Sequence, residues 1–205
     1  MQGYIINTQQ VRDEDLLVSI LTQENFYTTY RFYGARHSNI NIGFKIDFEL
    51  ETNYKSTIPR LKDVIQLGFS WIFERSKMYC WQRFLKLFYD HLKDVQEVDS
   101  FYFLLLEQLI VKLQKQDPKR AIVEAYVQLC EHEGRLHRDF ECLLCENHIE
   151  NYIALVRGFI PTHPQCSLGM GIEKEKLQIL FNEKNTLPLS EQQIEYLWEI
   201  ILQGI

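Results

Sequence analysis

Four potential metal ligands occur as two closely spaced pairs in the second half of the chain. Cys142 and Cys145 are separated by two residues, and His163 and Cys166 repeat this spacing after a gap of seventeen residues. The arrangement C-x2-C-x17-H-x2-C is typical of a structural zinc site, because each short gap lets a tight turn direct both ligands at one ion. Zinc accepts thiolate and imidazole ligands in a tetrahedron. A complete Cys3His set leaves no open coordination position, which favours a folding role over a catalytic one.

The same cysteines admit other interpretations. Cys142 and Cys145 can be read as a thiol redox pair, which requires a reactive cysteine of low pKa, or as small apolar side chains. In both cases His163 and Cys166 would lie nearby by coincidence, and two matched half-motifs favour the metal. His148 is close enough in sequence to replace His163 as the fourth ligand.

No other residue pattern indicates catalysis. The sequence lacks the glycine-rich phosphate loops, the G-x-S-x-G nucleophile elbow and the H-E-x-x-H metal motif. Three consecutive acids, Asp13, Glu14 and Asp15, are interpreted as a solvated turn between strands, not as a cation site. We therefore expect a protein that is not an enzyme.

Composition and charge narrow the class of protein. The chain has 205 residues, of which 46% are hydrophobic and 24% are charged, as in soluble globular proteins of one large or two small domains. It has no cleavable leader and no run of eighteen apolar residues, so we expect a cytoplasmic protein without a membrane partner. The net charge of −6 argues against a protein covered by nucleic acid but leaves room for a local basic groove.

The elements that position these residues change in character near residue 70. Before it, segments rich in β-branched and aromatic residues recur at about ten-residue intervals, which predicts a small all-β barrel or sandwich. In one of them Phe44, Ile46 and Phe48 alternate with charged residues, as in a half-buried strand. The expected strands are residues 4–8, 16–22, 26–33 and 42–50, with residues 61–69 as a fifth strand or a short closing helix.

After residue 70 the apolar spacing becomes helical. The expected helices cover residues 71–92, 101–116 and 119–131, and two more follow the metal segment. Asp117 before Pro118 predicts the start of the third helix, and Ser190 with Gln193 predicts a capping box on the last. The predicted class is α+β, with a β domain at residues 1–70 and a helical domain at residues 71–205 that contains a zinc knuckle at residues 142–166.

Residues 30–38 combine cations with aromatic rings, which are the side chains that hold single-stranded nucleic acid. Strand alternation places Arg31 and Tyr33 on one face, and Arg36, His37 and Lys45 extend the set of phosphate donors. Alternatively, the rings belong to the barrel core and Arg36 is a solvated loop residue. A second basic group is either a continuation of the positive surface or a solvated helix end: Lys112, Lys115, Lys119, Arg120, Arg135 and Arg138.

The chain resembles the bacterial recombination mediator family RecO in a short form. The resemblance rests on residues 13–24, which hold an acidic pair and an "lv-x-x-lT-x-E" strand, and on the Gly34-Ala35-Arg36 element that a serine follows after His37. The order of β domain, helical domain and metal knuckle also agrees with the family. Asn25 replaces a usual glycine, His163 replaces a usual cysteine ligand, and the acidic net charge departs from the pattern.

This resemblance implies an N-terminal OB-fold and a non-enzymatic role in the RecF pathway of DNA repair and recombination. Proteins of this family bind single- and double-stranded DNA, anneal complementary strands, and act with RecR to load recombinase onto strands covered by single-strand-binding protein. It assigns Arg31, Arg36, His37 and Lys45 to phosphate contact and Tyr33 to base stacking. It places a pocket for the acidic tail of single-strand-binding protein in the helical part. Two alternatives stay open: a scaffold in the same pathway that does not bind DNA, and a metal or thiol redox protein.

Overall fold

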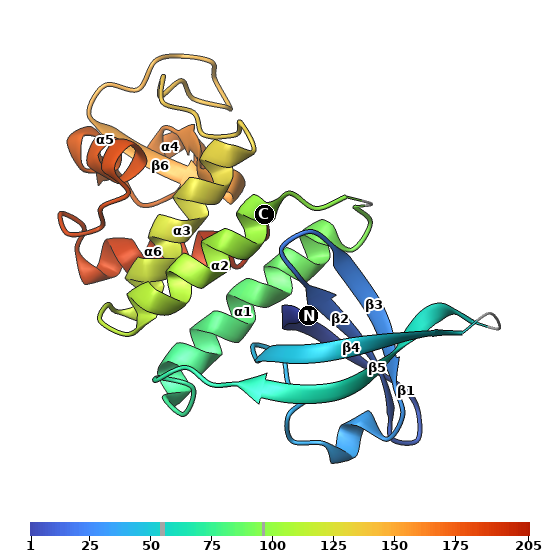
Figure 1. The fold of residues 1–205 in the computed structure, drawn as a ribbon. Coiled ribbons are helices and arrows are strands. Elements are labelled where there is room, and N and C mark those ends of the chain that lie inside the picture. The colour runs from blue at the N-terminus through green and yellow to red at the C-terminus, as the bar shows by residue number, and fades with distance from the viewer. Residues whose placement is uncertain (54–55, 96) are drawn as a thin grey trace. The chain divides into compact units, whose positions relative to one another are not determined.

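Five strands close into a barrel in the N-terminal part of the chain. The computed structural model describes residues 1–53, 56–95 and 97–205. Neighbouring strands pair in the order β1-β2-β3-β5-β4, and β4 pairs with β1 to close the barrel (Figure 1). The strands are β1 (Gln2–Arg12), β2 (Asp15–Leu21), β3 (Phe26–Arg31), β4 (Lys45–Asn53) and β5 (Ser56–Leu67). The predicted five-stranded barrel is confirmed, and its fifth segment is a strand.

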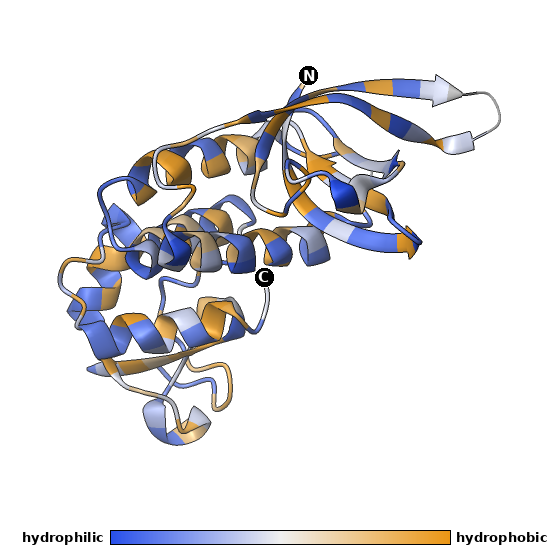
Figure 2. Ribbon diagram, turned by 90° about the horizontal axis from the view of Figure 1, so that it is seen from below, coloured by the Kyte–Doolittle hydropathy of each residue, from blue (hydrophilic) through white to orange (hydrophobic). Residues whose placement is uncertain are grey.

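The inward-facing side chains of these strands form one apolar core. Figure 2 shows orange and blue residues alternating along the long hairpin of β4 and β5, as expected for strands with one buried face. Burying an aliphatic or aromatic side chain is worth roughly 1.5–3 kcal/mol relative to leaving it exposed, so this core makes the barrel a firm frame for outward-facing residues. Its buried members are Ile5, Leu16, Val18, Ile20, Ile40, Ile46, Phe48 and Leu61.

Two helices, α1 (Arg75–Leu92) and α2 (Ser100–Leu113), belong to the same compact unit as the barrel. Trp81 of α1 is fully buried, and its indole N–H donates to the carbonyl oxygen of Gly43 at 2.8 Å. Helix α1 begins at Arg75, four residues later than predicted. The residues before it form turns instead, in which the amide of Glu74 donates to the carbonyl of Trp71.

Residues Lys115–Ile205 form a second compact unit. Its helices are α3 (Pro118–His132), α4 (Pro164–Ser167), α5 (Lys174–Glu183) and α6 (Glu191–Ile201). The side chain of Asp117 accepts hydrogen bonds from the first amides of α3, and Ser190 with Gln193 forms a capping box on α6. Both helix starts are therefore where the capping residues predict them.

The second unit also contains a three-stranded antiparallel sheet, which the sequence did not predict. The sheet has the order β7-β6-β8, with β6 (Tyr152–Val156), β7 (Ile160–Thr162) and β8 (Ile172–Glu173). Strands of five, three and two residues are too short to display alternation. Residues 153–155 are all buried, so they appear in the sequence only as an apolar run.

The division of the chain differs from the change in secondary structure. The two compact units are Met1–Gln114 and Lys115–Ile205, whereas strands give way to helices near residue 70. The assignment of residues 1–70 and 71–205 to separate domains stays a prediction. In the described part of the chain, none of the helices combines the length and apolar character that a bilayer crossing requires.

Candidate metal centre and nucleic-acid interface

The two ligand pairs predicted from the sequence lie together in the second unit. One ligand atom from each of Cys142, Cys145, His163 and Cys166 lies within 4.8 Å of the others. Nδ1 of His163 is 3.4 Å from Sγ of Cys145 and 4.0 Å from Sγ of Cys166. A tetrahedral zinc ion with ordinary bond lengths holds nitrogen and sulfur ligands about 3.6 Å apart. The four donors therefore fit one tetrahedral ion bound through Nδ1 of His163.

Backbone turns aim each pair of ligands. The amide of Glu146 donates to the carbonyl of Cys142 at 2.8 Å, which closes the first turn. Strand β7 ends directly before His163, and the amide of Cys166 donates to the carbonyl of His163 at 3.0 Å, which closes the second. The short sheet that the sequence did not predict is thus the element that brings the second pair to the first.

The thiols of the cluster differ in acidity. Burial raises the pKa of Cys142, but the amides of His163, Leu144 and Cys145 donate to its sulfur, and the balance lowers this pKa to about 6. Desolvation and the neighbouring thiols of Cys145 and Cys142 raise the pKa of Cys166 to about 11. The sulfur of Cys142 therefore favours the thiolate form, whereas ionisation of Cys166 close by is unfavourable unless a cation is bound.

His148 does not join the cluster. Its Nε2 lies 3.0 Å from Nζ of Lys174, and its side chain is exposed. Of the two histidines that the sequence offered as the fourth ligand, His163 is the one whose ring faces the thiols.

Two of the residues predicted to contact DNA have charged groups that are already engaged with protein oxygens. Nη1 of Arg31 donates to the carbonyl oxygen of Leu61 at 2.8 Å. Nζ of Lys45 lies 2.8 Å from a carboxylate oxygen of Glu107, and the Lys45 side chain is only 19% exposed. Contact of Arg31 and Lys45 with phosphate stays a prediction, although binding would have to replace these internal contacts.

The other three predicted residues are accessible. Tyr33, Arg36 and His37 are exposed around the short helix η1 (Gly34–Arg36), and the guanidinium of Arg36 lies 5.4 Å from the centroid of the Tyr33 ring. Arg36 also forms an ion pair with Glu14. Their contact with DNA stays a prediction.

The acidic run is not simply the solvated turn that we expected. The carboxylate of Asp15 accepts hydrogen bonds from the hydroxyl of Tyr30 at 2.6 Å and from the amide of Tyr33 at 2.8 Å. These two donors hold the pKa of Asp15 below its usual value. Together with the ion pair of Glu14, they fasten the β1–β2 turn to the segment that follows β3.

A groove of about 1000 Å³ crosses the outer face of the barrel beside these residues. The ring of Phe32 is 43% exposed, and the guanidinium carbon of Arg60 lies 4.4 Å from its centroid. Tyr30 packs edge-on against Phe32 at 4.8 Å. OB-folds bind oligonucleotides on the face of strands 2 and 3 and the loops beside it. This groove includes Leu17 of β2 and Tyr30 of β3 and extends onto residues of β1 and β5. It is lined by Val11, Arg12, Leu17, Tyr30, Phe32, Ser56, Ile58 and Arg60.

The aromatic and cationic residues of β3 pointed to a binding surface, but the prediction chose the other face of the strand. It assigned DNA contact to Arg31 and Tyr33, whereas the groove is lined by Tyr30 and Phe32. Tyr27 packs against the barrel core and Thr29 is fully buried, so β3 turns its odd-numbered residues inward. Arg31 continues this inward set, whereas Tyr30 and Phe32 face the groove. Arg60 comes from β5, distant in sequence, and no local pattern places it beside Phe32.

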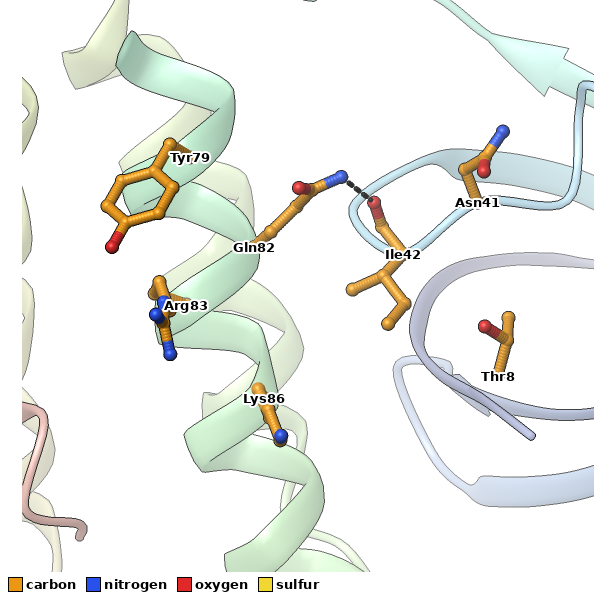
Figure 3. Close-up of a pocket in the computed structure, with 7 residues that line it drawn as sticks. All are labelled: Thr8, Asn41, Ile42, Tyr79, Gln82, Arg83 and Lys86. Atoms are coloured by element: carbon orange, nitrogen blue, oxygen red, sulfur yellow. Dashed lines mark hydrogen bonds between the residues drawn. The ribbon is translucent and has the colours of Figure 1, made fainter. Parts of the chain in front are cut away.

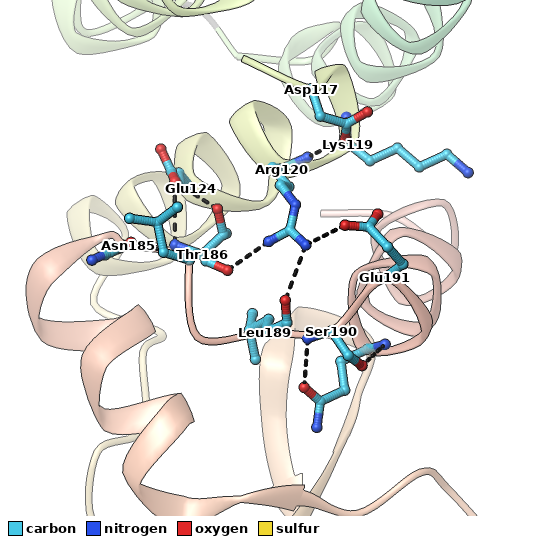
Figure 4. Close-up of polar contacts among 11 residues, drawn as sticks. Asp117, Lys119, Arg120, Glu124, Asn185, Thr186, Leu189, Ser190 and Glu191 are labelled. Carbon is cyan, nitrogen blue, oxygen red and sulfur yellow. Dashed lines mark hydrogen bonds and ion pairs between the residues drawn. The ribbon is translucent and has the colours of Figure 1, made fainter.

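Most cations of the second basic group, which begins at Lys112 and ends at Arg138, form contacts inside the second unit. Arg120 donates to the carbonyl oxygens of Thr186 at 2.7 Å and Leu189 at 3.0 Å, and it pairs with Glu191 (Figure 4). This cation therefore holds the connection between α5 and α6 against α3. Three further members form ion pairs with carboxylates: Lys119, Arg135 and Arg138.

The N-terminal part of the chain matches a known protein family. Residues 1–72 match the family model described as the RecO N-terminal domain. These residues cover the whole barrel and end three residues before α1 begins. A search of curated proteins finds no match to the chain.

Proposed function

Because residues 1–72 form a RecO-type N-terminal domain, we propose that the protein is a recombination mediator that binds DNA and anneals complementary strands. A general role in DNA repair and recombination follows from the domain type. The observation that carries direct DNA binding is the groove, in which the exposed ring of Phe32 lies beside the guanidinium of Arg60 on the outer face of an OB-type barrel.

The groove suits a single strand. A base stacks on Phe32, and stacking is worth about 1–3 kcal/mol per base without regard to sequence. Arg60 lies beside this ring and Arg12 lines the same groove, and in this proposal the two contact the phosphates on either side of the base. Tyr33, Arg36 and His37 extend the contact past η1. The protein needs no bond chemistry for annealing, so we infer that it is not an enzyme.

The metal centre has a separate, structural role in this proposal. Cys142, Cys145, His163 and Cys166 hold one zinc ion, which supplies a fourfold cross-link between two turns. All four positions are filled by protein ligands, so no water or substrate reaches the ion. This arrangement opposes the redox alternative, which needs an open position or a solvent-facing low-pKa thiol, whereas the thiol of low pKa, Cys142, is only 1% exposed.

We propose RecR and single-strand-binding protein as partners, as the domain type suggests. A pocket of about 500 Å³ in the second unit suits the acidic tail of single-strand-binding protein. Leu143, Val156 and Ile160 supply its apolar lining, and Arg135 and Arg157 supply its cations. An apolar tail residue enters the pocket while its carboxylates meet the arginines.

This pocket also supports the second candidate function, a scaffold that reaches DNA only through partners. The net charge of −6 favours that reading. A salt titration of DNA binding distinguishes the two functions. Affinity that comes from direct phosphate contact falls as the salt concentration rises, whereas a scaffold alone has no measurable affinity for DNA.

Binding of a fluorescent oligothymidylate tests the proposal. Phe32→Ala is expected to weaken binding about 5- to 150-fold, from the loss of one stacked base. Phe73→Ala is the matched control, since Phe73 is 93% exposed and lies outside the groove. Equal effects of the two substitutions would remove the groove from the proposal.

Annealing of complementary strands, with and without single-strand-binding protein, tests the wider role. Arg36→Ala is expected to slow annealing, and an unchanged rate would exclude Arg36 from the DNA contact. A wild-type protein that binds the tail of single-strand-binding protein but neither binds nor anneals DNA is the scaffold.

A further inference from the structure

A second pocket in the first unit lies along α1, outside the barrel groove. It has a volume of about 400 Å³. Helix α1 supplies most of its side chains, and Figure 3 shows Gln82 reaching from the helix to the loop before β4 while Arg83 and Lys86 follow along the helix. The lining residues are Thr8, Asn41, Ile42, Tyr79, Gln82, Arg83 and Lys86.

The lining carries two cations and no carboxylate. In the described residues, neither Arg83 nor Lys86 has a carboxylate oxygen within ion-pair distance, and Asp90, one turn beyond Lys86, is not part of the lining. This differs from Lys45 and Lys62 of the same unit, each of which pairs with a glutamate. Arg83 and Lys86 are therefore available to bind an anion from outside the protein.

An exposed aromatic ring accompanies the two cations. Tyr79 is 52% exposed, and the guanidinium carbon of Arg83 lies 5.4 Å from its ring centroid. Asn41 and Thr8 add polar side chains on the barrel side. A ring beside two cations fits a ligand that carries both a flat heterocycle and a phosphate, whereas an acidic peptide would use the cations alone.

The two walls of the pocket are fixed to each other. Nε2 of Gln82 donates to the carbonyl of Ile42 at 2.8 Å, and Nε1 of Trp81 donates to the carbonyl of Gly43 at 2.8 Å. Gly43 has a φ of +96°, and a β-carbon there would lie 2.9 Å from the Trp81 ring. The loop and helix thus meet in one arrangement, so a ligand does not need to order them.

We propose that this pocket binds the phosphate of a nucleotide through Arg83 and Lys86, with the base against Tyr79. The inference rests on the proposed function where that nucleotide belongs to a DNA strand. Strand β1 contributes Thr8 to this pocket and Val11 to the groove. At about 3.4 Å per residue these positions are about 10 Å apart, so one strand of DNA reaches both sites.

The test compares two double variants that remove the same charge from the same helix. Arg83→Gln with Lys86→Gln empties the pocket of cations, and Arg75→Gln with Lys93→Gln removes two exposed cations of α1 and its C-cap outside the pocket. Oligothymidylate affinity is measured against salt for each. Two lost phosphate contacts lower the slope of log affinity against log salt by about 1.4 for single strands, and the control is expected to keep the wild-type slope.

A cross-linking experiment locates the base. An oligonucleotide carrying one 5-iodouracil is expected to cross-link to Tyr79 in the wild type and control, and not in the pocket variant. Equal salt slopes in both variants, or cross-links that avoid Tyr79, would overturn the inference while leaving the groove intact.

Titration with inorganic phosphate and with thymidine 5′-monophosphate, followed by amide chemical shifts, separates the sources of the nucleotide. Shifts at Tyr79 and Lys86 with the mononucleotide identify a site for free nucleotides, even in a protein that binds no DNA. Shifts with the oligonucleotide alone identify a contact to the strand. If inorganic phosphate, the mononucleotide and the oligonucleotide all leave the amide shifts unchanged, the proposed site is rejected.

Discussion

Removal of His163 gives the sharpest test of the metal centre. We expect wild-type protein to hold one zinc ion per chain, His163→Asn to lose it, and His148→Asn to keep it. The two substitutions are matched, since both remove an imidazole close to the same turns. They differ in place, because Nδ1 of His163 faces two thiols whereas Nε2 of His148 meets Lys174.

The size of the effect follows from the loop that the metal closes. The interval between Cys145 and His163 spans 18 residues (163 − 145). Closing a loop of this length removes about 3 kcal/mol of chain entropy from the unfolded state on the cross-link model, and a metal clip acts in the same way. For a unit of 91 residues (205 − 115 + 1), this loss corresponds to a drop in unfolding temperature of roughly 10–25 °C. His148→Asn is expected to change the free energy of unfolding by no more than about 0.5 kcal/mol.

Elemental analysis and calorimetry measure these quantities, and hydrogen exchange localises them. The amides of residues 142–166 are expected to lose protection in His163→Asn and in wild type treated with a chelator. A His163→Asn protein that keeps a full equivalent of zinc and its unfolding temperature would refute the cluster as a metal site. A chelator that leaves the wild type unchanged would refute the structural role.

Three further predictions concern contacts within one unit. Tyr30→Phe removes one of the two donors that lower the pKa of Asp15, so this pKa should rise toward its ordinary value in a carbon-detected NMR titration. Because the pKa of Asp15 is depressed in the folded state, the contact stabilises the fold above the unfolded pKa. That stabilisation is lost as the pH falls through the folded pKa. Arg120→Ala leaves the carbonyls of Thr186 and Leu189 without their charged donor and should cost about 2–3 kcal/mol in urea unfolding, whereas a cost below about 0.5 kcal/mol would mean that water replaces it. Gly43→Ala places a β-carbon against the Trp81 ring at positive φ and should destabilise the first unit by about 1–3 kcal/mol, and unchanged thermal unfolding would contradict the close approach.

The elements that the sequence predicted are those with a long or repeated local pattern. The barrel strands are six or more residues long and rich in β-branched and aromatic residues, and α3 and α6 begin at side chains that cap their own amides. The metal cluster could be predicted for the same reason, since each ligand pair is a local turn. The sheet β7-β6-β8 could not, because its longest strand has five residues and is mostly buried.

The predicted DNA residues illustrate a different limit. A strand fixes only which residues share a face, and a single register decides whether that face is the core or the surface. Arg31 lies two residues after the fully buried Thr29 and therefore shares its face of β3. Its guanidinium donates a hydrogen bond to the carbonyl oxygen of Leu61 in β5. Phe32 and Arg60 meet through the parallel contact of β3 with β5 at Tyr30 and Arg60. That contact joins residues 30 positions apart, which no local pattern specifies.

The acidic net charge does not exclude a DNA site, because exposed charges that lie farther from a bound strand than a Debye length of about 8 Å are largely screened. Some carboxylates are also outnumbered by the cations around them. Lys62 and Arg60 share Glu51, and Lys184 and Arg138 share Glu131, so each of these groups has a local net charge of +1. What a strand of DNA meets is therefore the local balance. The pocket on α1 has two cations without a carboxylate, whereas the groove keeps Arg60 beside Glu51 and depends more on its rings. Affinity in the groove should then be comparatively tolerant of salt, and the salt-sensitive share of binding should lie with Arg83 and Lys86.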